Sequence, residues 1–137
     1  MRLEINVKLQ DDFYINEFLH SDDRYYPNDQ HKINLYQLAE KAQIARNIFR
    51  QSMRVTSGYR SKEYNKKVKG DYDSYHMDGL AMDFELLNDK RIEDYSNWSP
   101  TAIFNVLNFA GFHNVGLSVR KGTKNIQWIH ADIGVQR

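Results

Sequence analysis

The chain has 137 residues, of which 41% are hydrophobic and 13% aromatic, enough for one folded domain with a hydrophobic core. Its 19 basic and 18 acidic residues nearly cancel, which argues against binding of nucleic acid through bulk charge. It has no cysteine, so disulfides and thiolate ligands are excluded. No segment resembles a signal peptide or a membrane span, so we expect that another route delivers the protein if it acts outside the cytoplasm.

The first third of the chain predicts one ordered arm and two helices. Alternating hydrophobic residues over 1–9 are typical of a strand or an ordered arm. A short helix is expected over 13–19, followed by a loop over 21–30. Helical spacing of leucine and alanine predicts a long helix over 33–50, with Asn34 as its N-cap.

The rest of the chain predicts short strands mixed with helices. Ser61 and Ser99 each precede a helical pattern in the position of an N-cap, and a polar hairpin loop is expected over 120–125. Strands are expected over 53–56, 80–87, 115–119 and 126–133. Helices are expected over 62–69 and 100–111. The sum is an α+β fold, with helices packed on a small, mainly antiparallel sheet. We divide the chain into an arm (1–12) and one domain (13–137).

Asp83 is the residue that fits this pattern least well. Strand alternation places Met82 and Phe84 on the core face and Asp83 with Glu85 on the other face. An unpaired buried carboxylate costs several kcal/mol, on the order of 2–7 for a neutral polar group and more for a charge. A positive partner is therefore expected, either a metal ion or an arginine such as Arg60.

Two histidines can join Asp83 in a metal site. His130 shares a predicted strand face with Trp128 and Asp132, opposite Gln127. His76 lies seven residues before Asp83, so the chain has to bend between them, and Gly79 permits that bend. Three protein ligands leave one zinc position open, which favours catalysis over a structural role.

The other three histidines are interpreted as surface or hydrogen-bonded residues without a functional role. They are His20, His31 and His113.

The pattern Ser74-x-His76-x-x-Gly79-x-Ala81-x-Asp83, answered by His130-x-Asp132, resembles the zinc D-alanyl-D-alanine metallopeptidases of bacteria and phages. That family includes carboxypeptidases, dipeptidases and phage endolysins that cut peptidoglycan stem peptides. The segment 55–61 also resembles its upstream signature, and the resemblance covers roughly 13–134.

The resemblance implies a hedgehog-like or D-Ala-D-Ala peptidase-like fold with a zinc cleft and a set of site residues. One zinc ion would be held by His76, Asp83 and His130. Arg60 would bind the substrate carboxylate or stabilise an oxyanion, with a structural ion pair to Asp83 or Glu63 as the alternative.

Two further residues are expected to line the substrate pocket. Ser74 would hydrogen-bond substrate, unless it only caps the turn before His76. Tyr59 is one of several aromatic residues near the motifs that could line a groove for a glycopeptide, with ordinary packing as the alternative.

The sequence departs from the family at Gln127. Several branches of the family carry a general-base carboxylate three residues before the last zinc histidine, and an amide cannot take up that proton. Asp132 and Glu85 share the predicted face of the ligands. We assign Asp132 a catalytic role as the base, with orientation of a ligand as the alternative.

The main hypothesis is a zinc peptidase that cleaves a D-Ala-containing bond of peptidoglycan, as a carboxypeptidase or an endopeptidase. The small size suggests a phage lysis or virion-associated protein, found in the host cytoplasm before lysis or on the virion. The alternatives are a zinc-stabilised binding or structural module whose catalysis has weakened and, with less support, a His/Asp metal nuclease. The bond cleaved and the oligomeric state are left open.

Overall fold

The structure is a computed structural model that describes residues 2–122 and 125–135. Its centre is an antiparallel four-stranded sheet in the order β3-β4-β6-β5. The strands are β3 (Ser52–Ser57), β4 (Ala81–Leu87), β6 (Ile126–Asp132) and β5 (Asn114–Val119). A second, two-stranded sheet pairs β1 (Lys8–Gln10) with β2 (Phe13–Tyr14). The helical elements are η1 (Ile15–Phe18), α1 (Asp29–Phe49), α2 (Lys62–Lys67), η2 (Tyr75–Asp78) and α3 (Pro100–Ala110).

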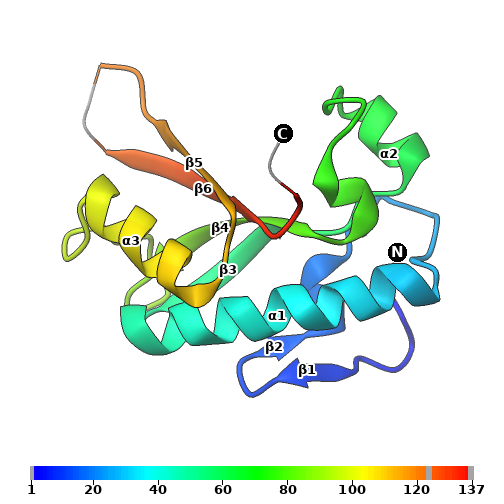
Figure 1. The fold of residues 1–137 in the computed structure, drawn as a ribbon, viewed down its shortest axis with the longest axis horizontal. Helices are drawn as coiled ribbons and strands as arrows, with labels where there is room; N and C mark the ends of the chain where they lie inside the picture. The colour runs from blue at the N-terminus through cyan, green and yellow to red at the C-terminus, as the bar shows by residue number, and fades with distance from the viewer. Residues whose placement is uncertain (1, 123–124, 136–137) are drawn as a thin grey trace.

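The elements form layers, with the long helix α1 lying between the main sheet and the β1–β2 hairpin (Figure 1). Alternate residues of β4 and β6 point from the sheet into the core, where Met82, Phe84 and Ile129 are fully buried. Leu35 of α1 and Leu107 of α3 belong to the same core cluster. The opposite face of the sheet is therefore left for the polar side chains, while α2 and η2 lie toward one end of the molecule (Figure 1).

The α+β class and the mainly antiparallel sheet are confirmed. The predicted strands and helices after residue 50 agree with the structure to within one or two residues. Ser61 and Ser99 cap α2 and α3 by accepting hydrogen bonds from the backbone amides of Tyr64 and Ala102. In the predicted hairpin loop over 120–125, residues 123–124 lie outside the described residues. The division into an arm and a domain at residues 12 and 13 stays a prediction.

The strand or ordered arm expected over 1–9 is a strand over Lys8–Gln10, and before it the Leu3 amide and the Asn6 side chain are hydrogen-bonded to Asn16. Two other predictions for the N-terminal third are wrong in detail. The short helix expected over 13–19 is β2 followed by η1. Helix α1 begins at Asp29 with Asn28 as its N-cap, whose side chain accepts from the His31 amide at 2.8 Å.

Asn34 is therefore not the N-cap of α1, because the polar residues after Asn28 form an exposed first turn that hydrophobic spacing does not reveal. The Asn34 side chain instead donates to the Asp78 carbonyl at 2.8 Å and joins α1 to η2.

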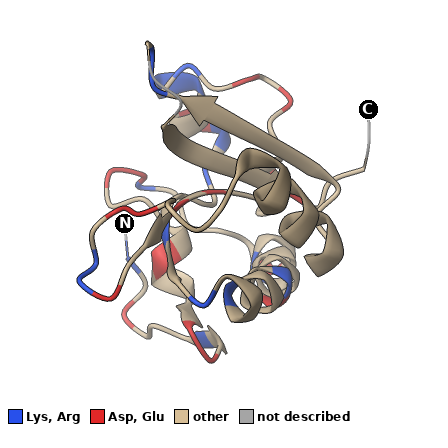
Figure 2. Ribbon diagram, turned by 90° about the vertical axis from the view of Figure 1, so that its left-hand side faces the viewer, with Lys and Arg blue, Asp and Glu red and all other residues tan. Residues whose placement is uncertain are grey.

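Basic and acidic residues are interspersed along the helices and loops (Figure 2). This distribution agrees with the near-zero net charge of +1. Among the described residues, no helix is both long and apolar enough to cross a membrane.

Candidate metal centre

Three side chains converge on the polar face of the main sheet: His76, Asp83 and His130. The Nδ1 atom of His130 lies 2.8 Å from Asp83 Oδ1, and the Nε2 atom of His76 lies 3.5 Å from the same oxygen. One ligand atom from each residue lies within 4.8 Å of the others. Ligand atoms around a tetrahedral zinc ion with bonds of about 2.0–2.1 Å lie roughly 3.3–3.5 Å apart, so this set fits zinc after small side-chain movements.

Sheet register and one glycine bring these residues together. Asp83 on β4 pairs directly with His130 on β6, so both side chains project from the same face. His76 lies in η2, and Gly79 then turns the chain into β4 with φ at +73°, as the sequence predicts. A Cβ atom at position 79 would lie 2.8 Å from the His31 carbonyl oxygen, so both the conformation and the close packing require glycine.

Each histidine is held by a partner on the ring nitrogen that faces away from Asp83. The Nδ1–H group of His76 donates a hydrogen bond to the Gly58 carbonyl oxygen at 2.7 Å. This contact orients Nε2 toward the cluster. The Nε2 atom of His130 lies 2.9 Å from Asp132 Oδ2, and this fixes Nδ1 toward Asp83. The donor atoms are thereby preoriented before any metal binds.

Asp132 is buried at 5% exposure behind the ring of His130. Its second carboxylate oxygen accepts from Asn114 Nδ2 at 2.7 Å and from the Gly134 amide at 3.2 Å. Both oxygens are thus engaged, and neither contact involves His76 or Asp83. This geometry favours the orienting role of Asp132 over the role of general base, while its catalytic assignment stays a prediction.

The charges of the cluster depend on one another. Burial by itself raises the pKa of Asp83, but hydrogen bonds from His130 and His76 outweigh it and hold the pKa well below its usual range. Burial lowers the pKa of His130, yet its hydrogen bonds to Asp132 and Asp83 raise the pKa to about 9. Without a metal, His130 is therefore protonated at neutral pH and bridges the two carboxylates.

Arg60 lies at the edge of the cluster. Its guanidinium approaches Asp83 Oδ2 at 3.7 Å, and it donates to Ser57 Oγ at 3.1 Å and to Asn65 Oδ1 at 3.2 Å. The sequence predicts Asp83 or Glu63 as an ion-pair partner of Arg60, and the structure shows the ion pair with Asp83. His20 contacts the same Ser57 hydroxyl, with 3.2 Å between Nε2 and Oγ, and so belongs to the surroundings of Arg60.

The structure places the two predicted substrate-binding residues differently. Ser74 caps η2 by accepting from the His76 amide at 3.2 Å and also lines a cavity beside His130. Tyr59 is only 5% exposed and its ring packs 4.8 Å from that of His31, outside the cluster, so its substrate-binding role stays a prediction.

Gln127 lies on a different face from the one predicted. The β5–β6 register shifts between Ser118, which pairs with Trp128, and Val119, which pairs with Ile126. This bulge turns Gln127 outward beside Trp128, and Gln127 lines a cavity together with Asp83. The signal in the sequence was the pair Ile126 and Ile129, which are both buried although three residues apart.

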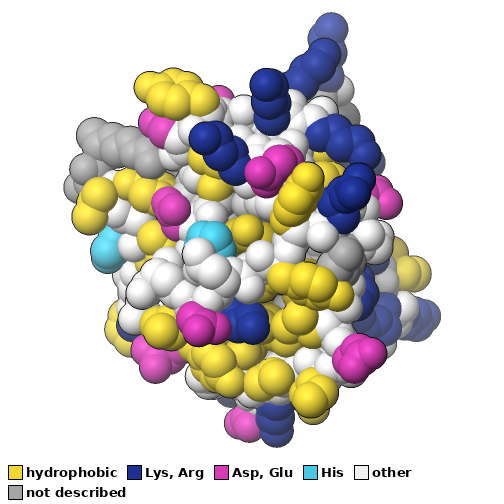
Figure 3. All heavy atoms as spheres, turned by 90° about the vertical axis from the view of Figure 1, so that its right-hand side faces the viewer, with side chains coloured by type: hydrophobic (Ala, Val, Ile, Leu, Met, Phe, Trp, Pro, Cys, Tyr) yellow, Lys and Arg dark blue, Asp and Glu magenta, His cyan; other side chains and the backbone are white. Residues whose placement is uncertain are grey.

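Figure 3 shows the end of the molecule where α2 and the start of α1 lie. Lysine and arginine side chains gather in one corner of this face, and hydrophobic side chains gather elsewhere on it. A histidine is visible near the middle of the face, with acidic side chains close to it.

The fold and the cluster together define an α+β domain with a three-residue His–Asp–His candidate metal site. The model of the Peptidase M15 family matches residues 12–119, and the chain belongs to this family, a family of zinc-dependent peptidases. The L-Ala D-Glu endopeptidase ChiX of Serratia marcescens is a similar solved structure, with 16% identity and a TM-score of 0.45 over 81% of this chain and 93% of that chain. No curated protein matches the chain.

The raised pKa of His130 predicts a pH-dependent metal affinity. Zinc has to displace the proton that His130 carries at neutral pH, so the apparent affinity should rise with pH, by up to about tenfold per unit, and level off above about pH 9. Titration of the metal-free protein with zinc across pH 6 to 10, with release of protons into a weak buffer, measures this.

His31→Gln is the matched control, since His31 lies outside the cluster, and the affinity and its pH dependence should be retained. Affinity that does not change between pH 6.5 and 9 would contradict the proposed proton competition.

Asp132→Asn should lower zinc affinity about 10–100-fold, because the amide removes the charge that holds the His130 ring. Activity should return when zinc is added to saturation if Asp132 only orients the ligand. Persistent loss with the zinc site filled would instead identify Asp132 as the base.

Proposed function

We propose that this protein is a zinc-dependent peptidase that cleaves peptidoglycan stem peptides at a bond involving D-alanine. The convergence of His76, Asp83 and His130 in a chain of the Peptidase M15 family carries this proposal. The resemblance of its motifs to those of D-alanyl-D-alanine peptidases supports the substrate class. Action on the cell wall during phage lysis, or as a virion component, is part of the proposal and is supported by the phage endolysins within that family.

Zinc bound to the three ligands would supply Lewis acidity to a water molecule and to the carbonyl oxygen of the scissile bond. The side chains of this protein supply the rest. Arg60 is positioned by Ser57 and Asn65 so that its guanidinium can stabilise negative charge that develops on the carbonyl oxygen. Asp132 keeps His130 in the orientation that binds the metal, and Ser74 offers a hydroxyl in the adjoining cavity.

Cleavage of purified peptidoglycan tests this proposal directly. The zinc-loaded protein should release peptide fragments that mass spectrometry identifies, and a chelator should abolish the release until zinc is restored. Asp83→Asn should reduce the rate at least about 100-fold, because it removes a ligand charge at the centre of the site.

Lys90→Met is the control, since Lys90 is exposed in the segment between β4 and α3 and lies outside the cluster. A zinc-loaded, folded protein that cleaves no bond at any pH would refute the proposed peptidase.

The observed place of Gln127 favours a second candidate function, that of a zinc-stabilised binding module. Gln127 lines the cavity that contains Asp83, yet its amide cannot accept a proton from water. The two glutamates of that cavity are held in ion pairs, Glu85 with Arg54 at 2.7 Å and Glu93 with Arg120 at 3.1 Å. A binding module would retain zinc and bind peptidoglycan without cleaving it.

The variant Gln127→Glu distinguishes an enzyme that lacks a general base at position 127 from one in which another group serves as the base. Because the side chain faces the cavity of Asp83, a carboxylate there should raise kcat at least about tenfold if a general base is lacking. Gln30→Glu, on an exposed turn of α1, is the control for added charge. An unchanged kcat would show that another group already carries the proton.

A further inference from the structure

Two cavities meet at the candidate metal centre. The first, of about 270 Å³, has His130 in its wall, and the second, of about 370 Å³, has Asp83 in its wall. The side chains of these two residues touch at 2.8 Å, so the metal cluster lies between the two cavities. The first cavity is lined by Asp71, Asp73, Ser74, Tyr75, Asn114, His130 and Asp132. The second is lined by Thr56, Asp83, Glu85, Glu93, Arg120, Gln127 and Trp128.

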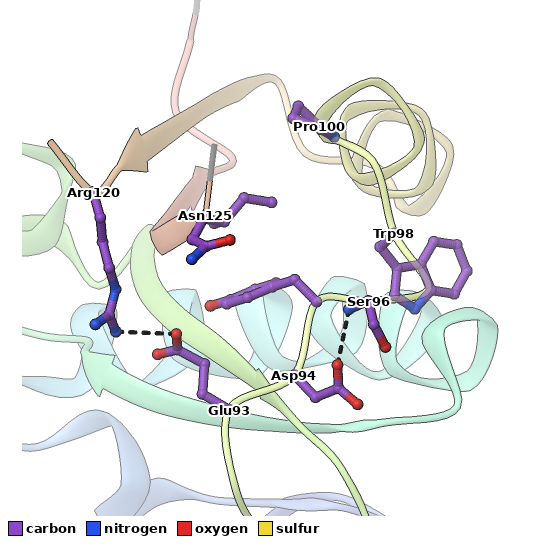
Figure 4. Close-up of a pocket in the computed structure, with 9 residues that line it drawn as sticks. Glu93, Asp94, Ser96, Trp98, Pro100, Arg120 and Asn125 are labelled. Atoms are coloured by element: carbon purple, nitrogen blue, oxygen red, sulfur yellow. Dashed lines mark hydrogen bonds and ion pairs between the residues drawn. The ribbon is translucent and has the colours of Figure 1, made fainter. Parts of the chain in front are cut away.

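A third cavity adjoins the second at the ion pair of Glu93 and Arg120. This third cavity, of about 480 Å³, extends to Tyr95, Trp98 and Pro100. Figure 4 shows the ion pair of Arg120 and Glu93 at one side of this third cavity, with Trp98 and Pro100 at the other. An extended ligand that crosses the metal centre therefore has room on both sides of it.

The charge of these cavities does not suit a free terminal carboxylate. The first cavity presents the carboxylates Asp71, Asp73 and Asp132, and no lysine or arginine lines it within the part of the chain that the structure describes. In the second, Arg120 is the cation among the described lining residues, and Glu93 already pairs with it at 3.1 Å.

Arg60 does not supply the missing contact either. Its guanidinium already pairs with Asp83 at 3.7 Å and donates hydrogen bonds to Ser57 and Asn65, so it is not an uncompensated cation. A peptidase that removes one C-terminal residue has to bind the carboxylate of that residue, which lies about one residue length, roughly 3.3–3.6 Å, from the scissile bond. Neither neighbouring cavity offers an uncompensated cation among its described residues.

We infer that the enzyme is an endopeptidase, which binds a stem peptide across the metal centre and cleaves an internal bond. In this reaction the oxygen of water joins the carbonyl carbon, the C–N bond breaks, and the amine leaves with a proton. The new carboxylate and the new amine both remain on peptide fragments of more than one residue. This inference rests on the proposed function and refines its substrate class.

Matched substrates test the inference. A stem peptide whose scissile bond is identified from digested peptidoglycan is made in three forms: ending one residue after that bond as a free acid, ending there as an amide, and extended by two further residues. The zinc-loaded enzyme should cleave acid and amide with kcat/KM values within about threefold, and the extended peptide at least about tenfold faster. Digests of cross-linked peptidoglycan should contain fragments of several residues.

The variant Arg120→Met tests whether Arg120 binds a terminal carboxylate of the substrate. The ratio of kcat/KM for acid and amide should stay the same as in the native enzyme and in the control Lys90→Met. A selective loss on the free acid would overturn the inference, because Arg120 would then hold a substrate terminus.

The failures of the two proposals are distinguishable. Release of single C-terminal residues, with the amide cleaved more than tenfold more slowly than the acid, would overturn the endopeptidase inference and leave the peptidase function intact. No cleavage of any of the three peptides or of peptidoglycan, with zinc bound, would overturn the proposed function itself.

Discussion

The carboxylate of Asp83 is the group on which the rest of this site depends. It lies on the central strand β4, with His130 at 2.8 Å, His76 at 3.5 Å and Arg60 at 3.7 Å. These partners come from β6, from η2 and from the segment after β3, so several distant segments meet on one charge. A charge in such a half-buried position is costly without partners, so these segments have to pack together for the charge of Asp83 to be compensated.

The groups behind the histidines determine what the cluster can bind. The Gly58 carbonyl and the Asp132 carboxylate each occupy one ring nitrogen, so the other nitrogen of each ring is left for Asp83 or for a metal. In the metal-free protein the proton on His130 compensates the two carboxylates. A divalent ion in its place would provide that compensation with more charge.

The sequence predicted the parts of the site that depend on local rules. The period of two in β4 placed Asp83 opposite Met82 and Phe84, and the bend at Gly79 follows from its spacing to His76. The face of Gln127 was predicted wrongly, because strict alternation overlooks the three-residue spacing of Ile126 and Ile129, and the position of the bulge depends on the pairing of β6 with β5. Burial of Tyr59 likewise depends on its contact with His31, from a helix more than twenty residues earlier.

The second cavity, beside Asp83, has its origin in a change of partner along β4. This strand pairs with β6 as far as Phe84 and Ile129, whereas Leu87 pairs with Glu93 from the following loop. Between these points, the bulge in β6 directs Gln127 and the neighbouring Trp128 outward. The sheet thus leaves a gap in its pairing where Glu85 projects, and the second cavity lies there. The room that the inferred endopeptidase substrate would find beside Asp83 therefore follows from the strand pairing of the sheet.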